Sequence, residues 1–493
     1  MSDQTPADST GQRPESEPAP EAGAIVTRAR LPFVIASAAV AFLLLAAGAL
    51  LAGVAVGGQS AVTAPPEPTR TSGPRSVPPV VPPAVHLRTC SVAALASDPD
   101  LEVLHAAVLR LDGDGAELLY GADATSPVTV GGVMKLYTAA SALRVLGADY
   151  RISTSVVEGE APGTAVLIAR GDPTLSRLPE GQDSFYPGAP KVASLAAQLV
   201  DSWSLAHPGV PLTQLVIDTT YWNQGDNWNS AWPSDARSAG TMPSITSFMV
   251  DGDRDDPTAQ TSKRSADPVA RATSAFLDAL AAADPTGAVI DPGLTVTSGA
   301  ATSSAALLAE VQSQKISSLV QFMLQTDDHT LAEMLARVIS QRDGLDGSMS
   351  SVAGAIPSSL TESDIPVGRL VVDDGSGVST RSQVAPEDLA TFLGLIQDGS
   401  DGLDVIADAL AVAGESGGLA DRFTDSPVRG DVSAKTGRNA LATAMAGIVQ
   451  AHDGALLAFA VSASRDGVGT GAWAPMDALV EGFYECGSNL AAN

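Results

Sequence analysis

Positive charge is scarce in this chain. Its 493 residues include 28 Lys and Arg against 56 Asp and Glu, so the formal net charge is -28. A protein that binds nucleic acid through its phosphates needs a basic surface, and an acidic chain is also poorly suited to docking on anionic lipid or polymer. The composition therefore argues against nucleic acid as a partner. It is typical of the soluble, self-repelling surface of an exported domain.

Aromatic residues and cysteines are scarce as well. Aromatics make up 4% of the chain and hydrophobic residues 45%, so Ala, Val and Leu must fill a core of ample size. With only Cys90 and Cys486, a zinc or iron-sulfur site built on cysteine is not expected, and neither a metal nor another cofactor is predicted. The two cysteines flank nearly the whole folded region. In an exported chain a disulfide between them is allowed, and two buried free thiols are the alternative.

The N-terminal part of the chain divides into three segments without a folded core. Residues 1–30 are rich in Pro, Glu, Ser and Ala, which predicts a disordered tail. Residues 31–58 carry no charge, and this run is longer than the roughly 20 residues that span a bilayer. Residues 59–87 hold eight prolines and predict a semi-rigid spacer.

The flanks of the uncharged run predict how it is oriented. Two arginines directly precede it, which places the N-terminus in the cytoplasm and the remainder of the chain outside. We therefore expect a single-pass membrane protein with an extracytoplasmic main domain. Cleavage just after the run, as in a signal peptide, is the alternative.

Beyond residue 88 the pattern alternates between helix and strand periodicities, so an α/β fold is expected. Strands are predicted over 105–111, 116–120, 215–218, 441–449 and 454–462, and helices over 90–96, 135–145, 267–283, 304–323, 330–341, 386–396 and 476–484. No chemistry is evident between 160 and 305.

Lys435-Thr436-Gly437 is the most informative motif. A Lys-Thr-Gly on a strand edge is one of three motifs that build the site of penicillin-recognising serine enzymes, together with Ser-x-x-Lys and Ser-x-Asn. Lys135 has surroundings typical of the first motif, but the residue three positions before it is Gly132. Glycine has no nucleophilic group.

Six segments in this order resemble the S13 peptidase family, the D-alanyl-D-alanine carboxypeptidases and endopeptidases among the low-molecular-mass penicillin-binding proteins. The resemblance extends over about residues 90–490. The segments that carry it are 133–140, 146–154, 170–176, 327–333, 374–379 and 435–437.

The resemblance implies a penicillin-recognising (β-lactamase/transpeptidase-like) domain with an antiparallel sheet flanked by helices. Residues 88–160 and 305–493 would form it, and an inserted, mainly β region, 161–304, would split it. The N- and C-terminal helices would then lie together, which fits a bridge between Cys90 and Cys486.

The resemblance also implies roles for particular positions. In the family, a serine attacks the D-Ala-D-Ala amide and a lysine one helical turn later takes its proton. The second motif relays a proton and holds the substrate, while Lys and Thr of the third hold its terminal carboxylate. The candidate catalytic residues, vestigial without the serine, are Lys135 and Lys435, and the candidate substrate-binding residues are Asp327, His329, Thr436 and Gly437.

Two motifs depart from the family pattern. Gly132 replaces the serine, and Asp327-Asp328-His329 stands where Ser-x-Asn is expected. Ser126 and Thr129 lie upstream, on the preceding loop rather than beside Lys135. We interpret 327–329 as a solvated helix start rather than a metal site, because three adjacent helical residues do not converge on one point.

Two hypotheses about function follow. The first is a non-catalytic relative that binds the peptidoglycan stem peptide or a cell-envelope protein, with Lys135 and Lys435 vestigial. The alternative is an active D-Ala-D-Ala carboxypeptidase or endopeptidase with an unusual nucleophile. The Lys-Thr-Gly strand could also be retained for packing alone.

Overall fold

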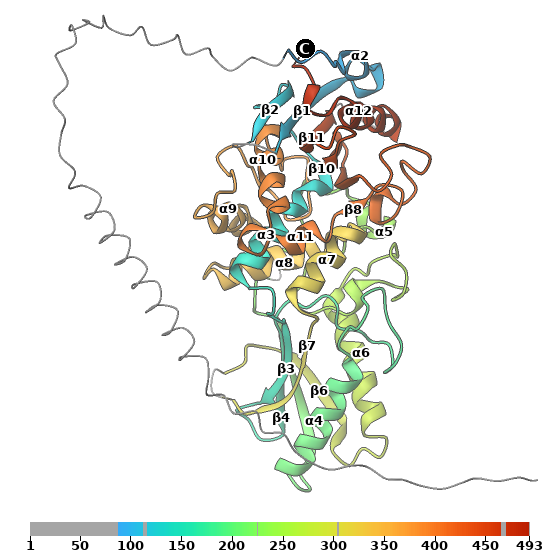
Figure 1. The fold of residues 1–493 in the computed structure, drawn as a ribbon. Coiled ribbons are helices and arrows are strands. Elements are labelled where there is room, and N and C mark those ends of the chain that lie inside the picture. The colour runs from blue at the N-terminus through green and yellow to red at the C-terminus, as the bar shows by residue number, and fades with distance from the viewer. Residues whose placement is uncertain (1–86, 112–115, 224, 303–304, 465–469, 493) are drawn as a thin grey trace, which may run out of the picture. The chain divides into compact units, whose positions relative to one another are not determined.

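The computed structural model describes residues 87–111, 116–223, 225–302, 305–464 and 470–492 (Figure 1). The predicted tail, membrane span and nearly all of the spacer lie outside these residues. Within the described part, none of the helices has the length and apolarity needed to cross a membrane.

The larger of the two sheets in the described chain is six-stranded and antiparallel, in the order β2-β1-β11-β10-β9-β8. The expected C-terminal hairpin is confirmed, with Met445 of β10 opposite Val461 of β11. The strands are β1 (Val103–Arg110), β2 (Glu117–Ala122), β8 (Ala411–Val412), β9 (Val432–Arg438), β10 (Ala442–Gln450) and β11 (Leu456–Ser464).

The two faces of this sheet pack against different helices, because alternate side chains of a strand point to opposite faces. Met445 and Phe459 face a core shared with α12 (Trp473–Cys486). On the other face, Ala446 and Ala460 join the core that includes α10 (Pro386–Gln397). Alanines predominate on this second face, so a chain with few aromatics still forms a tightly packed, helix-covered sheet.

A disulfide joins Cys90 and Cys486, as the sequence allowed, across a sequence separation of 396 residues. Next to it, Cys90 accepts a hydrogen bond from Ala491 N, and α12 lies beside the short helix α2 (Ala93–Ala96). The covalent link thus closes nearly the whole described chain into one loop, which stabilises the fold mainly by restricting the unfolded chain.

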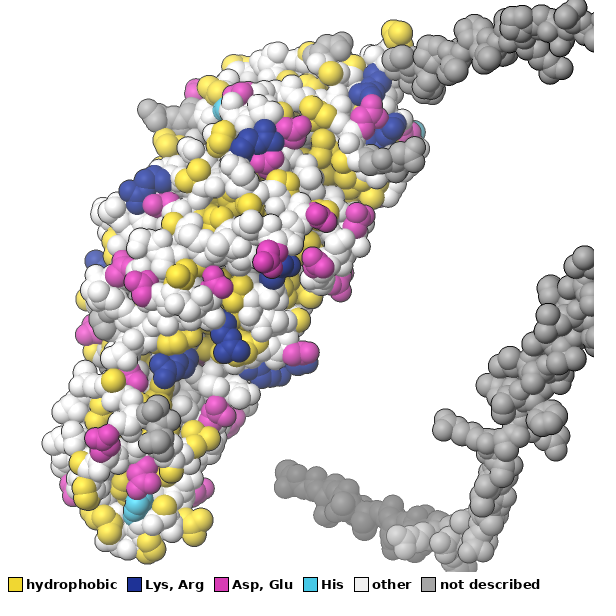
Figure 2. Space-filling model, turned by 90° about the vertical axis from the view of Figure 1, so that its left-hand side faces the viewer, with side chains coloured by type: hydrophobic (Ala, Val, Ile, Leu, Met, Phe, Trp, Pro, Cys, Tyr) yellow, Lys and Arg dark blue, Asp and Glu magenta, His cyan; other side chains and the backbone are white. Residues whose placement is uncertain are grey.

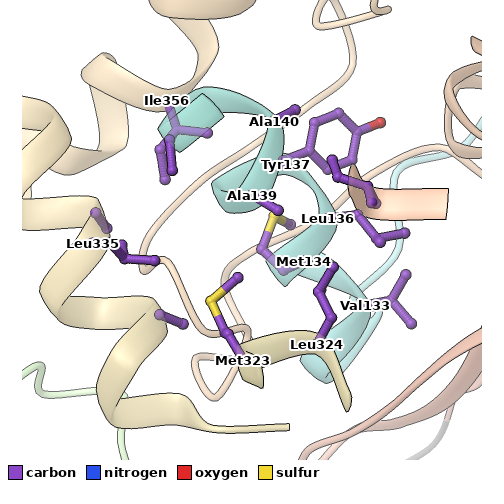
Figure 3. Close-up of a cluster of buried hydrophobic side chains, with 14 of the residues drawn as sticks. Val133, Met134, Leu136, Tyr137, Ala139, Ala140, Met323, Leu324, Leu335 and Ile356 are labelled. Atoms are coloured by element: carbon purple, nitrogen blue, oxygen red, sulfur yellow. The ribbon is translucent and has the colours of Figure 1, made fainter. Parts of the chain in front are cut away.

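Helix α3 (Lys135–Val145) lies in the interior, and each residue from Lys135 to Ala142 is buried. A helix that is buried on all sides has no polar face to solvent, so its first residue, Lys135, is also held away from water. Figure 3 shows Met323 and Leu324 of α7 (Ile316–Thr326) and Leu335 of α8 (His329–Arg342) around it, with Ile356 of α9 (Met349–Leu360).

A second, five-stranded sheet has the order β6-β5-β4-β3-β7 and mixes parallel and antiparallel pairs. Helices α4 (Val192–Ala206) and α6 (Pro268–Ala283) share a hydrophobic core with this sheet. Its strands are β3 (Ser153–Glu158), β4 (Thr164–Ala169), β5 (Leu212–Asp218), β6 (Ile290–Ser298) and β7 (Leu307–Gln312). Short elements complete the chain: α5 (Ala236–Ala239), α11 (Asp404–Ala407), η1 (Pro99–Leu101), η2 (Gly131–Met134), η3 (Asp251–Asp253), η4 (Ser400–Gly402), η5 (Gly417–Leu419), η6 (Thr470–Ala472) and η7 (Gly487–Asn489).

Two expectations for this region were wrong. The inserted region contains helices as well as strands and is not mainly β. The prediction missed α4, although Leu195, Leu199 and Trp203 recur at helical spacing. The helix expected over 304–323 is instead strand β7 followed by α7. A short apolar run cannot be assigned to helix or strand by periodicity alone, and here pairing with β3 decides for strand.

The surface in Figure 2 carries acidic and basic side chains interspersed, with hydrophobic side chains scattered between them. On that face no broad field of one sign is seen among the described residues.

Candidate functional site

Three segments far apart in the sequence meet at one carboxylate. Lys135 begins α3, Asp327 lies between α7 and α8, and Lys435 lies on β9. Lys135 Nζ is 2.9 Å and Lys435 Nζ 2.7 Å from the same atom, Asp327 Oδ1. The structure thus brings the two candidate catalytic lysines together with a candidate substrate-binding residue.

Burial makes this ion triplet strong. The side chains of Lys135 and Lys435 are 0% and 3% exposed, and that of Asp327 is 42% exposed. Burial alone would raise the pKa of Asp327, but the ammonium groups of the two lysines outweigh it and hold that pKa below its usual range. At neutral pH the carboxylate is charged and separates two like charges.

Gly132 lies directly against this carboxylate. A Cβ built on Gly132 would lie 2.6 Å from Asp327 Oδ1 and 3.2 Å from Lys135 Nζ. Position 132 therefore has the placement beside Lys135 that the first motif requires. The volume into which a serine side chain would extend is occupied by the carboxylate of Asp327.

Gly437, the glycine of the third motif, is required for a different reason than Gly132 is. A Cβ on Gly437 would lie 2.3 Å from the backbone oxygen of Val130, because β9 runs close to η2. Backbone cannot move aside cheaply, so this glycine is needed for packing. At Gly132 the obstacle is a side chain, which a second substitution can remove.

The hydrogen bonds of Lys135 are complete. Besides Asp327, its ammonium group reaches Ser376 O at 3.0 Å and His329 Nδ1 at 2.8 Å. Burial lowers the pKa of His329 to about 4, with Lys135 adding to the effect, so the ring is neutral at neutral pH and Nδ1 accepts. An ammonium group has three protons to donate, and each has a partner here.

The expectation of a solvated helix start at 327–329 was wrong. Asp328 is buried, caps α8 by accepting from Leu331 N at 2.7 Å, and pairs with Arg254 Nη2 at 2.8 Å. Arg254 comes from the inserted region. Nothing local in the sequence around Asp328 marks a partner 74 residues away.

The hydroxyls upstream of Gly132 have other partners. Thr129 Oγ1 accepts from Asn439 Nδ2 at 2.8 Å, and Ser126 Oγ donates to Asp123 Oδ1 at 2.6 Å. Among the described hydrogen bonds, neither hydroxyl meets Lys135. Both were expected on the loop that precedes the lysine.

Strand β9 lacks a strand partner beside the lysines, and Thr436 O there accepts a hydrogen bond from Lys435 Nζ at 2.6 Å. On the side of β9 away from β10, the neighbouring strand β8 pairs only with Ser433 and Ala434. Lys435 and Thr436 therefore have no strand partner on that side within the described sheet. An extended peptide can add to such an edge through backbone hydrogen bonds.

Sequence reasoning gave no role to Glu333, which lies behind the site. Its Oε1 accepts from Ser376 N at 2.7 Å, and Ser376 O in turn accepts from Lys135. Burial raises the pKa of Glu333 to about 8, and nearby Asp374 adds to the effect. The side chain is therefore mostly protonated at neutral pH and supports the loop that holds Lys135.

We expect Glu333→Gln to flatten the pH dependence of stability. A carboxyl group with a raised folded-state pKa contributes stability that is complete below its unfolded pKa and is lost as pH rises towards its folded pKa. From about pH 5 to pH 8 the wild-type melting temperature should fall relative to that of Glu333→Gln, by about 1 °C for each kcal/mol lost in a folded region of this size. Thermal melts across this range check the result, and parallel profiles for the two proteins would contradict it.

The fold belongs to a known structural class. Penicillin binding protein 4 of Haemophilus influenzae superposes with a TM-score of 0.62 at 18% identity, over 80% of this chain and 98% of that one. The described chain thus shares the fold of that protein, an α/β domain with an antiparallel sheet flanked by helices, as expected.

Sequence similarity identifies the family within that class. The model of the D-Ala-D-Ala carboxypeptidase 3 (S13) family matches residues 89–284 and 254–481. Carboxypeptidase DacB of Mycolicibacterium smegmatis is 31% identical over 407 residues, which is 81% of this chain and 84% of the relative. A D-alanyl-D-alanine carboxypeptidase of an Actinomadura species is 26% identical over 444 residues, 74% and 79% of the two chains. This chain belongs to the S13 family.

Proposed function

We propose that this protein is a membrane-anchored, extracytoplasmic S13-family protein that binds peptidoglycan stem peptide, or an envelope protein, without serine-nucleophile catalysis. The observation that carries the proposal is the contact at position 132. Gly132 has no hydroxyl, and the carboxylate of Asp327 fills the volume that a serine would need. Removing the nucleophile of such a site alone removes most of its rate.

The state of Lys135 supports the same conclusion. A lysine that acts as a base must be neutral and must reach the proton it accepts. Lys135 instead donates to Asp327 and Ser376 O and lies 2.8 Å from the acceptor nitrogen of His329. A lysine engaged with three partners serves to hold the site together.

Retention of the third motif, Lys435-Thr436-Gly437, supports the binding of a peptide. Two lysines share one carboxylate beside the part of β9 that has no strand partner. A peptide that adds to this edge would bring its terminal carboxylate near Lys435 and Thr436. The relatives named carboxypeptidases make a cell-wall peptide the first ligand to test.

Two observations support a membrane-anchored, extracytoplasmic localisation. The uncharged run 31–58 is long enough to span a bilayer, and the disulfide between Cys90 and Cys486 is of the kind that persists in oxidising compartments.

An active carboxypeptidase with an unusual nucleophile is the second candidate. It is favoured by the retention of both lysines and by the carboxylate they share, since carboxylates can act as nucleophiles. The same contacts weaken that role, because two ammonium groups at 2.7–2.9 Å stabilise the charge that an attack would consume.

A peptide ending in D-Ala-D-Ala separates the two candidates. Full-length protein in detergent should bind it reversibly in calorimetry, and Lys435→Met should weaken the binding, while mass spectrometry detects no released D-Ala. Release of D-Ala that Asp327→Asn abolishes would overturn the proposal in favour of the second candidate.

A further inference from the structure

Asp327 holds both lysines of the site with one of its two carboxylate oxygens. Its Oδ1 accepts from Lys135 Nζ at 2.9 Å and from Lys435 Nζ at 2.7 Å. For Oδ2 no hydrogen bond is found among the described residues, and His329 Nε2 lies 4.0 Å from it, beyond hydrogen-bond distance. Because the side chain is 42% exposed, this carboxylate has the lysines on one side and water on the other.

The backbone at Asp327 fixes the helix ends independently of the side chain. Asp327 has left-handed dihedral angles, φ 56° and ψ 34°, and its N–H donates to Met323 O at the end of α7. The next residue, Asp328, caps α8. Such a conformation is uncommon outside glycine, although Asp is among the residues that adopt it. Rotation about the side-chain torsions can therefore move the carboxylate off the lysines while both helix ends keep their hydrogen bonds.

Both lysines have further partners that do not depend on Asp327. Lys135 donates to Ser376 O at 3.0 Å. Lys435 donates to Thr436 O at 2.6 Å. With the carboxylate of Asp327 swung out, each lysine would keep these partners and have an N–H free to donate. Two donors that meet at one point form a ready site for an oxygen of another carboxylate.

We propose that Asp327 is an internal competitor for the carboxylate of a ligand at Lys135 and Lys435. An external carboxylate has the same chemistry as the side chain it displaces, so it binds only to the fraction of molecules in which Asp327 has swung out. The apparent dissociation constant is then the intrinsic one divided by that fraction. This competition rests on the proposed function in one respect, namely that the ligand carboxylate is the C-terminus of a peptidoglycan stem peptide.

Asp327→Gly is the variant that removes the competitor. Glycine adopts the left-handed conformation without steric cost, so the connection between α7 and α8 is kept and an external carboxylate can take the vacated place. Asp327→Asn keeps the size of the side chain without its charge, and it gives the same comparison if the glycine variant does not fold. Asp401→Gly is the matched control. Asp401 is also left-handed, with φ 54°, but its side chain is 71% exposed and none of its described contacts is with Lys135 or Lys435.

The first arm measures acetate binding to the full-length protein by ¹³C NMR at constant ionic strength. We expect Asp327→Gly to bind acetate at least tenfold more tightly than the wild type or Asp401→Gly, which corresponds to Asp327 leaving the lysines in about a tenth of wild-type molecules or fewer. Adding Lys435→Met should remove this gain. Equal affinity of the wild type and the Asp327 variants, or no binding to any of them, would overturn the competition. A gain that survives Lys435→Met would also overturn it, since the acetate would then bind elsewhere.

The second arm uses a peptide ending in D-Ala-D-Ala and the same peptide with a C-terminal amide. We expect Asp327→Gly to bind the free acid about tenfold more tightly than the wild type does, and the amide no more tightly. Acetate binding that Asp327→Gly strengthens, without binding of either peptide, would keep the competition and overturn the proposed function. Equal binding of the acid by the wild type and both Asp327 variants would keep the proposed function and overturn the competition.

Discussion

The double variant Gly132→Ser/Asp327→Ser should be labelled covalently by a penicillin, whereas Gly132→Ser alone should remain unlabelled. A Cβ at position 132 already lies 3.2 Å from Lys135 Nζ, so a serine there would stand beside its base. In the single variant, however, the new side chain meets Asp327 Oδ1 at 2.6 Å. That carboxylate also accepts a hydrogen bond from each of the two lysines, so in the single variant neither lysine is free to accept the proton of the new serine.

Intact-mass spectrometry after incubation with benzylpenicillin measures the result. The variant Asp327→Ser is the control, because it frees the lysines without supplying a nucleophile at position 132. An adduct on Gly132→Ser equal to that on the double variant would show that Asp327 does not obstruct the site.

Asp327→Ala should be the most destabilising single change at the site. It leaves the ammonium groups of Lys135 and Lys435, 0% and 3% exposed, facing each other without a counter-charge. Breaking a buried ion pair by removing one partner costs about 3 kcal/mol at the low end of the known range, and the partial exposure of Asp327 argues for that end.

Urea unfolding checks this loss, with an unchanged m-value as the sign that only stability changed. Asp149→Ala is the matched control, because Asp149 pairs with Lys315 at the surface, where such pairs contribute little to stability. Adding Lys435→Met to Asp327→Ala should recover part of the loss, since it removes one of the two repelling charges. A loss no larger than that of Asp149→Ala would mean that the triplet is not structural.

Local sequence patterns were sufficient to predict individual helices and a hairpin between neighbouring strands. The helix expected over 135–145 has those bounds, and the hairpin of β10 and β11 lies within a residue or two of the expected strands. The disulfide between Cys90 and Cys486, which the sequence allowed in an exported chain, is present, and the alternative of two free thiols is not.

Contacts between distant segments could not be read in the same way. Gly132 and Asp327 looked like two separate departures from the family pattern, yet they are in contact, and the carboxylate of one fills the space left by the other. The partner of Asp328, Arg254, comes from a region with no recognisable chemistry. Both depend on the three-dimensional packing of α3, the α7–α8 turn and the inserted region.

The most direct test of the central claim is the intact mass of the native full-length protein after prolonged incubation with excess benzylpenicillin. We predict an unchanged mass, because position 132 has no nucleophile and Lys135 is held by its three partners. A stoichiometric penicilloyl adduct would contradict this account, and peptide mapping of the adduct would then identify the nucleophile that the protein uses.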